Sequence, residues 1–339
     1  MKSLPPPKTI ALFYDGFERK ADPGLTGQAR SNVRGLARAA YRTLRRRQVH
    51  TGFYTAFRGL VSSLRANHID VRVNDFGYAR RHPGDPIGLA GYPSVWDKVN
   101  LPNPIIFGPG DYGSGAPARA LADRQNVRVL TQPCQWAVDI NRPWSGDEGE
   151  TYFAGIDTGH WNDRSASPKT LDFLVYDKIR WHRDTRVTSV LERSLEALRR
   201  RGLTYRVLRY GHHHVSAFKA GLTEARAMLF LCEHETQGIA YQEALSSGIP
   251  VLAWDEGVPV DPNMIAIAPP DLRVSAVPYF DRRCGMTFKL EDLEATLDSF
   301  IDDLPRYRPR EYVLEHLSLK RSGQRYLELY DLARRGGVD

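Results

Sequence analysis

Two glutamates, Glu235 and Glu243, lie eight positions apart in a segment whose residue types favour binding of a charged ligand. The apolar run Ala227 to Leu231 precedes them and predicts a buried parallel strand, which places Glu235 in the loop where that strand ends. Functional residues of parallel sheets usually lie at such carboxyl ends. Glu243 falls in the second turn of a helix predicted over Ile239 to Ser246. One carboxylate can therefore reach the near end of a ligand and the other its far end.

The start of that helix is suited to a phosphate. Helix N-termini carry unpaired backbone N–H groups, here those of Gln237, Gly238 and Ile239, and Gly238 lets the backbone approach a ligand closely. Gly248 ends the helix, and a further strand is predicted over Val251 to Trp254. The segment therefore predicts a strand, a helix and a strand with an anion site at the helix start.

Cations follow an earlier predicted strand, Asp172 to Tyr176. Lys178, Arg180 and Arg183 lie in the loop after it, at the same kind of sheet edge, where they could balance the charge of a bound phosphate. The alternative is a solvated basic turn. The sequence contains no Asp-x-Asp motif, which favours a site that works without a metal ion.

A known signature resembles the segment around the two glutamates. It is the E-x7-E signature of retaining glycosyltransferases with the GT-B fold (family 4-like, or group 1), and the residues that match it are Glu235, Gly238, Glu243, Ala244, Gly248, Pro250 and Val251. The resemblance implies an α/β protein with two Rossmann-like, doubly wound domains that face a cleft. It also implies transfer of a hexose from a UDP- or GDP-sugar to an acceptor hydroxyl, with no tightly bound cofactor.

The same resemblance implies roles for the donor-side residues. Glu243 would bind the ribose hydroxyls, while Glu235 with Thr236, Gln237 and Gly238 would contact the donor sugar and its phosphate. Retention would arise by front-side attack, in which the leaving phosphate helps to take the proton of the acceptor.

Lys178 and Arg183 are five residues apart, as is the Arg/Lys pair that grips the diphosphate in the resembled family. Here the order is Lys then Arg, and Asp177 replaces the usual glycine. Arg180 is a third candidate for the diphosphate.

Strands that alternate with helices along the chain predict two parallel sheets. Residues 135–169 lack sustained periodicity and are interpreted as the junction between domains. We expect an acceptor domain over residues 1–165, a donor domain over 166–311, and a helical tail over 312–339 that packs back on the first domain.

We expect the acceptor-side residues in the first domain. Gly52 precedes a helix predicted over Phe53 to Asn67, where the resembled family has a glycine-rich loop; a plain helix cap is the alternative. Asp111 and Tyr112 follow a predicted strand and could orient an acceptor hydroxyl, or belong to a loop without chemistry.

A basic amphipathic helix is predicted over Arg30 to Arg47, with arginines repeating at helical spacing. It could dock on an anionic membrane, a phosphorylated lipid or a nucleic-acid backbone, and a solvated arginine face is the alternative. The net charge of +7 agrees with any of these partners.

Three widely spaced cysteines indicate neither a disulfide framework nor a zinc site, and no window is long enough to span a membrane. We therefore expect a cytoplasmic protein, peripheral to the inner face of the membrane if the basic helix binds lipid. The acceptor would be a glycan, a lipid-linked saccharide or another small molecule. Three alternatives stay open: glycosylation of hydroxylated bases in DNA, sugar-nucleotide or partner binding without turnover, and a GT-B epimerase or phosphorylase.

Overall fold

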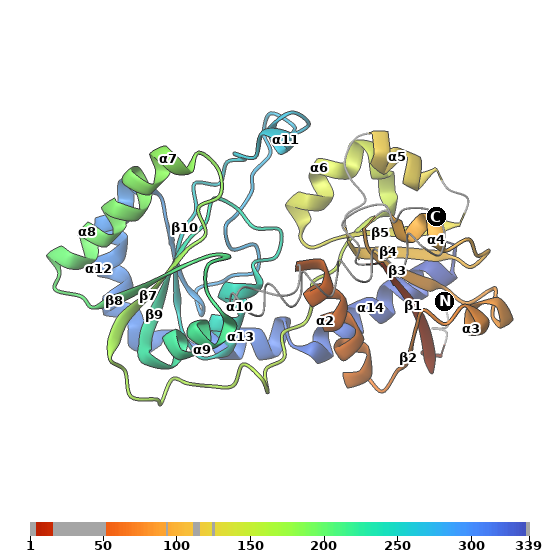
Figure 1. Cartoon of the computed structure of the whole chain (residues 1–339), viewed down its shortest axis with the longest axis horizontal. Coiled ribbons are helices and arrows are strands. Elements are labelled where there is room, and N and C mark those ends of the chain that lie inside the picture. Colours follow the sequence, from red (N-terminus) through yellow and green to blue (C-terminus); the bar gives the residue numbers. More distant parts are fainter. Residues whose placement is uncertain (1–4, 16–51, 93, 111–115, 124–125, 337–339) are drawn as a thin grey trace, which may run out of the picture. The chain divides into compact units, whose positions relative to one another are not determined.

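The computed structural model describes residues 5–15, 52–92, 94–110, 116–123 and 126–336. The chain folds as two compact units (Figure 1). The first unit takes the described residues up to Gly155 and those from Leu319 onward, and the second takes residues 156–318. The borders expected from the sequence were 165/166 and 311/312.

The first unit is built on a six-stranded parallel sheet with strand order β2-β1-β3-β4-β5-β6. Its strands are β1 (Thr9–Asp15), β2 (Asp70–Val73), β3 (Ile87–Gly91), β4 (Ile105–Gly110), β5 (Val127–Gln132) and β6 (Gly149–Thr151). Its helices are α2 (Gly52–Ala66), α3 (Phe76–Arg81), α4 (Ser94–Lys98), α5 (Ala116–Ala122), α6 (Gln135–Ser145) and α14 (Leu319–Arg334).

Both faces of this sheet are covered. Side chains alternate along β1, so that Ile10 and Leu12 pack with residues of α2 and α14, while Ala11 and Phe13 pack with residues of α3 and α4 on the opposite face. A parallel sheet with two buried faces is the doubly wound arrangement that the sequence predicted.

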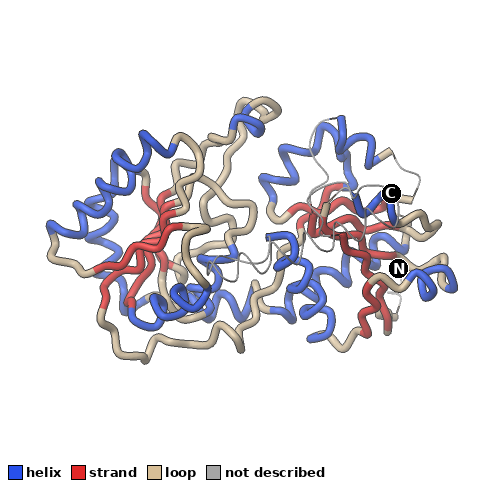
Figure 2. Tube along the Cα trace, in the orientation of Figure 1, coloured by secondary structure: helices blue, strands red, loops and turns tan. Residues whose placement is uncertain are grey.

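The second unit has a five-stranded parallel sheet with order β11-β10-β9-β7-β8, visible in red in Figure 2. Its strands are β7 (Leu171–Asp177), β8 (Tyr205–Arg209), β9 (Ala225–Leu231), β10 (Val251–Trp254) and β11 (Gly285–Phe288). Its helices are α7 (Arg183–Arg186), which continues through a π-helical stretch (Val187–Glu192) into α8 (Arg193–Arg200), then α9 (Val215–Glu224), α10 (Ile239–Ser246), α11 (Pro262–Ile265), α12 (Leu293–Asp303) and α13 (Pro309–His316).

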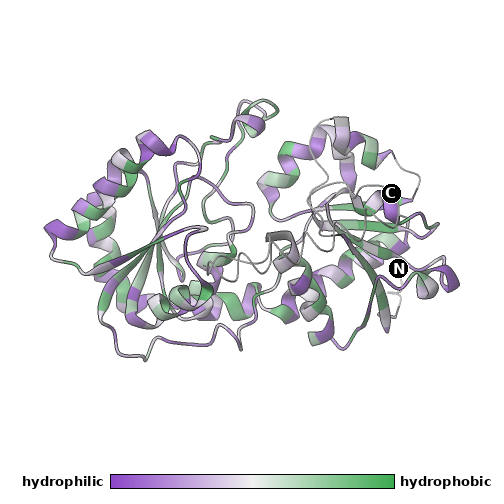
Figure 3. Ribbon diagram, viewed as in Figure 1, coloured by the Kyte–Doolittle hydropathy of each residue, from purple (hydrophilic) through white to green (hydrophobic). Residues whose placement is uncertain are grey.

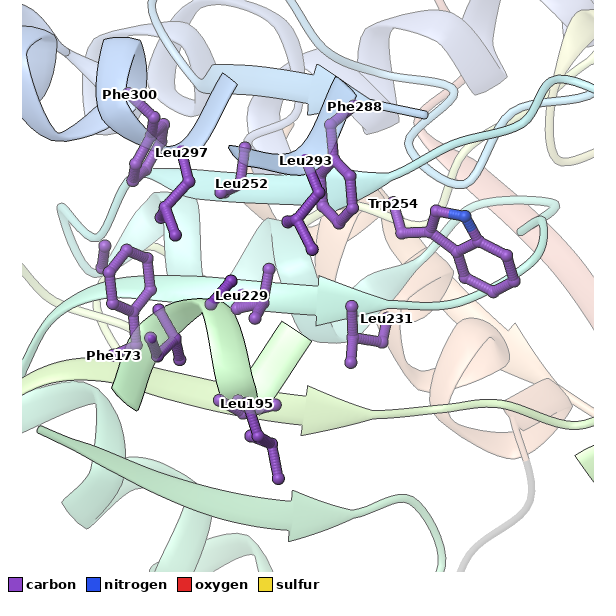
Figure 4. Close-up of a cluster of buried hydrophobic side chains, with 14 of the residues drawn as sticks. Phe173, Leu195, Leu229, Leu231, Leu252, Trp254, Phe288, Leu293, Leu297 and Phe300 are labelled. Atoms are coloured by element: carbon purple, nitrogen blue, oxygen red, sulfur yellow. The ribbon is translucent and has the colours of Figure 1, made fainter. Parts of the chain in front are cut away.

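One face of this sheet packs on α8 and α12, and the other on α9 and α10. Figure 4 shows the first contact, in which side chains of α8 and α12 meet those of the strands: Phe173, Leu195, Leu229, Leu231, Leu252, Leu293, Leu297 and Phe300. On the other face Phe230 of β9 packs against Tyr241 of α10, and Tyr176 of β7 packs against Phe218 of α9. Figure 3 shows the helices banded in hydrophobic and hydrophilic colours, as expected for helices with one face on a sheet.

The last helical region consists of two helices. The sequence predicted a helical tail from residue 312, whereas α13 begins at Pro309 and ends at His316, and α14 begins at Leu319, with Ser318 between them in a parallel bridge with Ile156. Helix α14 joins the first unit and packs closely on α2, as expected for the returning tail. Gly323 makes this approach possible: a Cβ there would lie 2.3 Å from the carbonyl oxygen of Ser63.

Several elements of the first unit lie where the sequence predicted none, among them β3 and α6. Strand β3 is fully buried but reads Ile-Gly-Leu-Ala-Gly, and Gly88 is needed because a Cβ there would lie 2.5 Å from Leu12. Helix α6 occupies the start of the segment interpreted as an irregular junction, so that interpretation was wrong for residues 135–145.

Candidate functional site

The carboxyl ends of β7 and β9 lie side by side. The two strands are paired in parallel with Asp177 opposite Leu231, and the backbone N–H of Lys178 donates to the carbonyl oxygen of Leu231 (2.8 Å). The loop after β7 and the loop after β9 therefore leave the sheet at the same edge. This pairing brings the cationic loop next to the loop that carries Glu235.

Glu235 and Lys178 form an ion pair at this edge, with side chains only 8% and 11% exposed. The thiol of Cys232 also donates to the Glu235 carboxylate (3.2 Å). Burial opposes ionisation of Glu235, but the charges of Lys178 and Arg180 hold the pKa of that carboxyl below its ordinary value. Burial likewise opposes the charge of Lys178, and Glu235 outweighs it, so the pKa of the lysine is raised. Both groups are therefore charged at neutral pH.

Arg183 is held elsewhere. Its guanidinium donates twice to the carboxylate of Asp177 (2.9 and 2.5 Å) and once to the carbonyl oxygen of Ile179 (2.9 Å). Asp177 is almost fully buried and ends β7 at the position where the resembled family has glycine. The structure thus gives Arg183 a buried counter-ion of its own and does not join it to the pair of Lys178 and Glu235.

Arg180 is exposed at the same loop. Its guanidinium donates to the carbonyl oxygen of His234 (2.5 Å) and lies 4.1 Å from the centre of the Trp181 ring. Trp181 in turn stacks on the imidazole of His234, with ring centres 4.5 Å apart. Burial and the nearby Arg180 lower the pKa of His234 to about 4, so this imidazole is neutral at pH 7.

Glu233 is a buried acid that the sequence analysis did not single out. Its carboxylate accepts hydrogen bonds from the backbone N–H groups of Arg180 (3.2 Å) and Trp181 (3.1 Å) and from the guanidinium of Arg186 (3.2 Å). The only signal in the sequence is its place two residues after the predicted strand. Its partners lie about fifty positions earlier and cannot be found by local pattern.

The loop before α10 has the geometry expected around a glycine. Gly238 is the N-cap in the left-handed region (φ 78°), and no side chain caps the helix there. Gln237 and Gln242 hold the loop by reciprocal bonds: the Gln237 amide donates to the Gln242 side chain (3.0 Å), and the Gln242 amide donates to the Gln237 carbonyl (2.9 Å). Thr236 stays exposed.

Glu243 lies in the second turn of α10 and is partly buried. Burial raises the pKa of Glu243 to about 8, with Lys219 acting weakly in the opposite direction. Within the described residues this carboxyl has no hydrogen bond or ion pair to another side chain. Apart from burial, the charges of both Glu243 and Glu235 raise the pKa of Tyr176, so this buried tyrosine lies near both acids.

Tyr210 follows β8 at the same edge of the sheet. The residue is 43% exposed, and the centre of its ring lies 4.5 Å from the Lys178 ammonium. The aromatic face therefore lies against the Lys178 ammonium and forms a cation–π contact with it.

One acceptor-side candidate, Gly52, lies among the described residues. Gly52 is the first residue of α2 in the first unit. Asp111, Tyr112 and the predicted basic helix over Arg30 to Arg47 lie outside the described residues.

A metal centre is not formed by the residues that the structure describes, among which no three His, Cys, Asp or Glu side chains are grouped to hold an ion. The run His212-His213-His214 serves the backbone instead. A ring nitrogen of His213 bonds the Arg209 carbonyl oxygen (2.9 Å), and His214 caps α9. In the described part of the chain, no helix has the length and apolar character needed to cross a membrane.

No protein-family model and no curated protein sequence matches the chain. Solved structures do. TarM superposes with a TM-score of 0.51 at 11% identity, over 75% of this chain and 57% of TarM. A variant of S. aureus TarM, solved with fondaparinux, alpha-GlcNAc-glycerol and UDP, gives a TM-score of 0.51 at 12% identity over the same shares. The fold is GT-B. WaaG, a glycosyltransferase of lipopolysaccharide biosynthesis, aligns over 95% of this chain and 99% of its own at 11% identity, with a TM-score of 0.47. The GT-B chain described here thus spans a little over half the length of TarM.

Proposed function

We propose that this GT-B chain is a glycosyltransferase that moves a sugar from a nucleoside diphosphate sugar to an acceptor hydroxyl, with retention of configuration. The observation that carries the proposal is the buried pair of Glu235 and Lys178 where β7 and β9 end, directly before the glycine-capped start of α10. A carboxylate, an ammonium group and a helix N-terminus at one sheet edge suit a ligand that is both anionic and rich in hydroxyls.

The diphosphate would be held by cations of the loop after β7. Lys178 is within reach of the Glu235 loop, and Arg180 is exposed beside it. Their positive charges would stabilise the negative charge that grows on the diphosphate as its bond to the sugar breaks. Arg183 would stabilise the conformation of the loop and not bind the diphosphate, because Asp177 already balances its charge.

The sugar and the ribose would be held by the loop and helix after β9. Glu235, with the backbone of Thr236, Gln237 and Gly238, would contact the donor sugar. Glu243 would bind ribose hydroxyls, since it is a partly buried carboxyl without a hydrogen bond or ion pair among the described residues.

Retention follows from a reaction on one face of the sugar. The bond from the anomeric carbon to the phosphate oxygen breaks, and the acceptor oxygen bonds to the same face of that carbon. The acceptor proton passes to the departing phosphate oxygen, which becomes the terminal oxygen of the nucleoside diphosphate. No side chain has to act as a nucleophile in this scheme. The acceptor would be a hydroxyl of a glycan or of a lipid-linked saccharide.

The test is release of nucleoside diphosphate from a panel of donors. UDP-glucose, UDP-GlcNAc, UDP-galactose and GDP-mannose are incubated with the protein, and free UDP or GDP is measured with and without simple glycan acceptors. UDP is the first nucleotide to test because the TarM variant was solved with it. We expect release from one donor, increased by an acceptor and lost in Glu235→Gln. Binding without release from any donor would leave only a sugar-nucleotide-binding protein.

A further inference from the structure

Two buried acids, Asp177 and Glu233, pair with arginines of α7, which follows the loop after β7. Asp177, the last residue of β7, takes Arg183, and Glu233, two residues after β9, takes Arg186 (3.2 Å). The two acids thus neutralise these two arginines of α7. Lys178 instead pairs with Glu235, and Arg180 donates to the carbonyl oxygen of the adjacent His234.

Glu233 does more than pair with Arg186. Both of its oxygens accept from the backbone N–H of Arg180 (3.2 Å each), and one also accepts from the N–H of Trp181 (3.1 Å). A carboxylate that accepts from two successive backbone N–H groups fixes the path of the chain between them. Its side chain is only 1% exposed, so solvent does not weaken these bonds.

The two residues after Glu233 add further contacts to the loop after β7. His234 stacks on Trp181 and accepts from Arg180, and Glu235 pairs with Lys178. Residues 233–235 therefore contact Lys178, Arg180 and Trp181 of the loop after β7, with Glu233 bound to the backbone and the other two bound to side chains. The orientation of Lys178 and Arg180 depends on the backbone that Glu233 holds.

We infer that Glu233 is a positioning residue, which holds the backbone of residues 180–181 so that Lys178 and Arg180 bind the diphosphate of the donor. This inference rests on the proposed function, because it assumes that a diphosphate binds at this edge. Glu233 itself does not touch the ligand. It acts through the loop, and a carboxylate suits position 233 because it offers only acceptors to the two backbone N–H groups and to Arg186.

The test separates the diphosphate from the rest of the nucleotide. Glu233→Gln keeps the shape of the side chain, but its amide has one acceptor oxygen for three donors and turns its own N–H groups toward them. Calorimetry with UDP, GDP and ADP first finds the nucleotide that wild type binds, and the matching nucleoside is measured beside it. We expect affinity for the nucleoside diphosphate to fall about tenfold in Glu233→Gln, with affinity for the nucleoside unchanged. Equal loss for both ligands, or no loss for either, would overturn the inference.

A second measurement needs no ligand. Amide hydrogen exchange of residues 178–182 should become faster in Glu233→Gln, since the two N–H groups lose their charged acceptor. The control is Glu192→Gln, the same change at a side chain that is 53% exposed in the same unit, and it should leave both exchange and binding unchanged. If wild type binds none of the three nucleotides, the proposed function and the inference fail together. If wild type binds and the exchange of the loop is unaltered in Glu233→Gln, only the inference fails.

Discussion

Lys178 and Glu235 pair as buried opposite charges where β7 and β9 end beside each other. Removing two charges from water is costly, and their attraction offsets that cost only while both are present. The pair is thus a poor source of stability and a good means of holding two charges ready for a ligand.

Glu235→Gln should lower the free energy of unfolding by about 3 kcal/mol, because it leaves the buried lysine without its counter-ion. Lys178→Met should lower the free energy of unfolding by a similar amount, because it leaves the buried Glu235 carboxylate without its counter-ion. The double variant should lose clearly less than the sum of the two, which urea denaturation of all four proteins measures as a double-mutant cycle. Glu192→Gln, at the exposed pair with Arg199, should leave stability nearly unchanged. Additive losses would contradict the coupling.

Gly238→Ala should destabilise the protein by two separate effects. Its φ of 78° is unfavourable for a residue with a Cβ, and that Cβ would lie 2.2 Å from the Tyr241 ring. Gly211 is the matched control, since its φ is 75° and nothing lies within 4 Å of the position of a Cβ. Gly211→Ala should therefore cost about 1 kcal/mol from the backbone alone, and Gly238→Ala roughly 1–3 kcal/mol more from the clash. Thermal unfolding of the two variants compares them directly, and equal losses would show that the contact with Tyr241 is not tight.

The unit from β9 to β10 could be predicted in detail, because its signals are local. An apolar run bounded by polar residues gave β9, and Gly238 and Gly248 bracket α10, whose observed bounds, Ile239–Ser246, are those expected. Strand β3 was missed because its two glycines and one alanine weaken any strand pattern, and its burial between β1 and β4 replaces that signal.

The pairing inside the site could not be predicted. Lys178 meets Glu235, and not Glu233, because of the register that sets Asp177 opposite Leu231. Arg183 instead meets Asp177, although its spacing from Lys178 suggested a shared role. Residue types identified the edge of the sheet, while strand register and burial decided which acid neutralises which base.

Glu243→Gln should change how stability depends on pH. The folded-state pKa of Glu243 is raised to about 8, so the folded protein holds this proton more tightly than the unfolded chain does. The stability that the proton contributes is fully present below the unfolded pKa of about 4.5 and is lost as the pH rises through 8. Glu243→Gln cannot lose a proton, so its stability relative to wild type should rise between pH 4.5 and 9, by up to about 5 kcal/mol at about 1.4 kcal/mol per pKa unit. Urea denaturation at pH 4.5, 7 and 9 measures this, and a constant difference would show that the carboxyl is not buried.

Glu243→Ala should weaken binding of the nucleotide by removing a carboxyl that hydrogen-bonds the ribose hydroxyls, a contact worth about 0.5–1.5 kcal/mol for the protonated group. The matched comparison lies in the ligand. Wild type and Glu243→Ala are titrated with UDP and with 2′,3′-dideoxy-UDP, or with the guanosine pair if wild type prefers GDP. The variant should lose affinity for the ribose form and not for the dideoxy form. An unchanged affinity for both would remove Glu243 from the donor site.

Arg180→Met and Arg183→Met should affect different properties of the protein. Arg183→Met should mainly lower stability, and Arg180→Met should mainly lower affinity for the nucleoside diphosphate. Arg183→Met leaves Asp177, which is 2% exposed, without its bidentate partner, so the free energy of unfolding should fall by about 3 kcal/mol. Arg180→Met removes one bond to the His234 carbonyl and the contact with Trp181, so stability should fall by only about 1 kcal/mol. Affinity for the nucleoside diphosphate should respond in the opposite order, with a loss of about tenfold in Arg180→Met and a smaller loss in Arg183→Met. If Arg183→Met instead lost the greater affinity at unchanged stability, the diphosphate would bind Arg183 in place of Asp177, and the pairing of Arg183 with Asp177 would have to open when the donor binds.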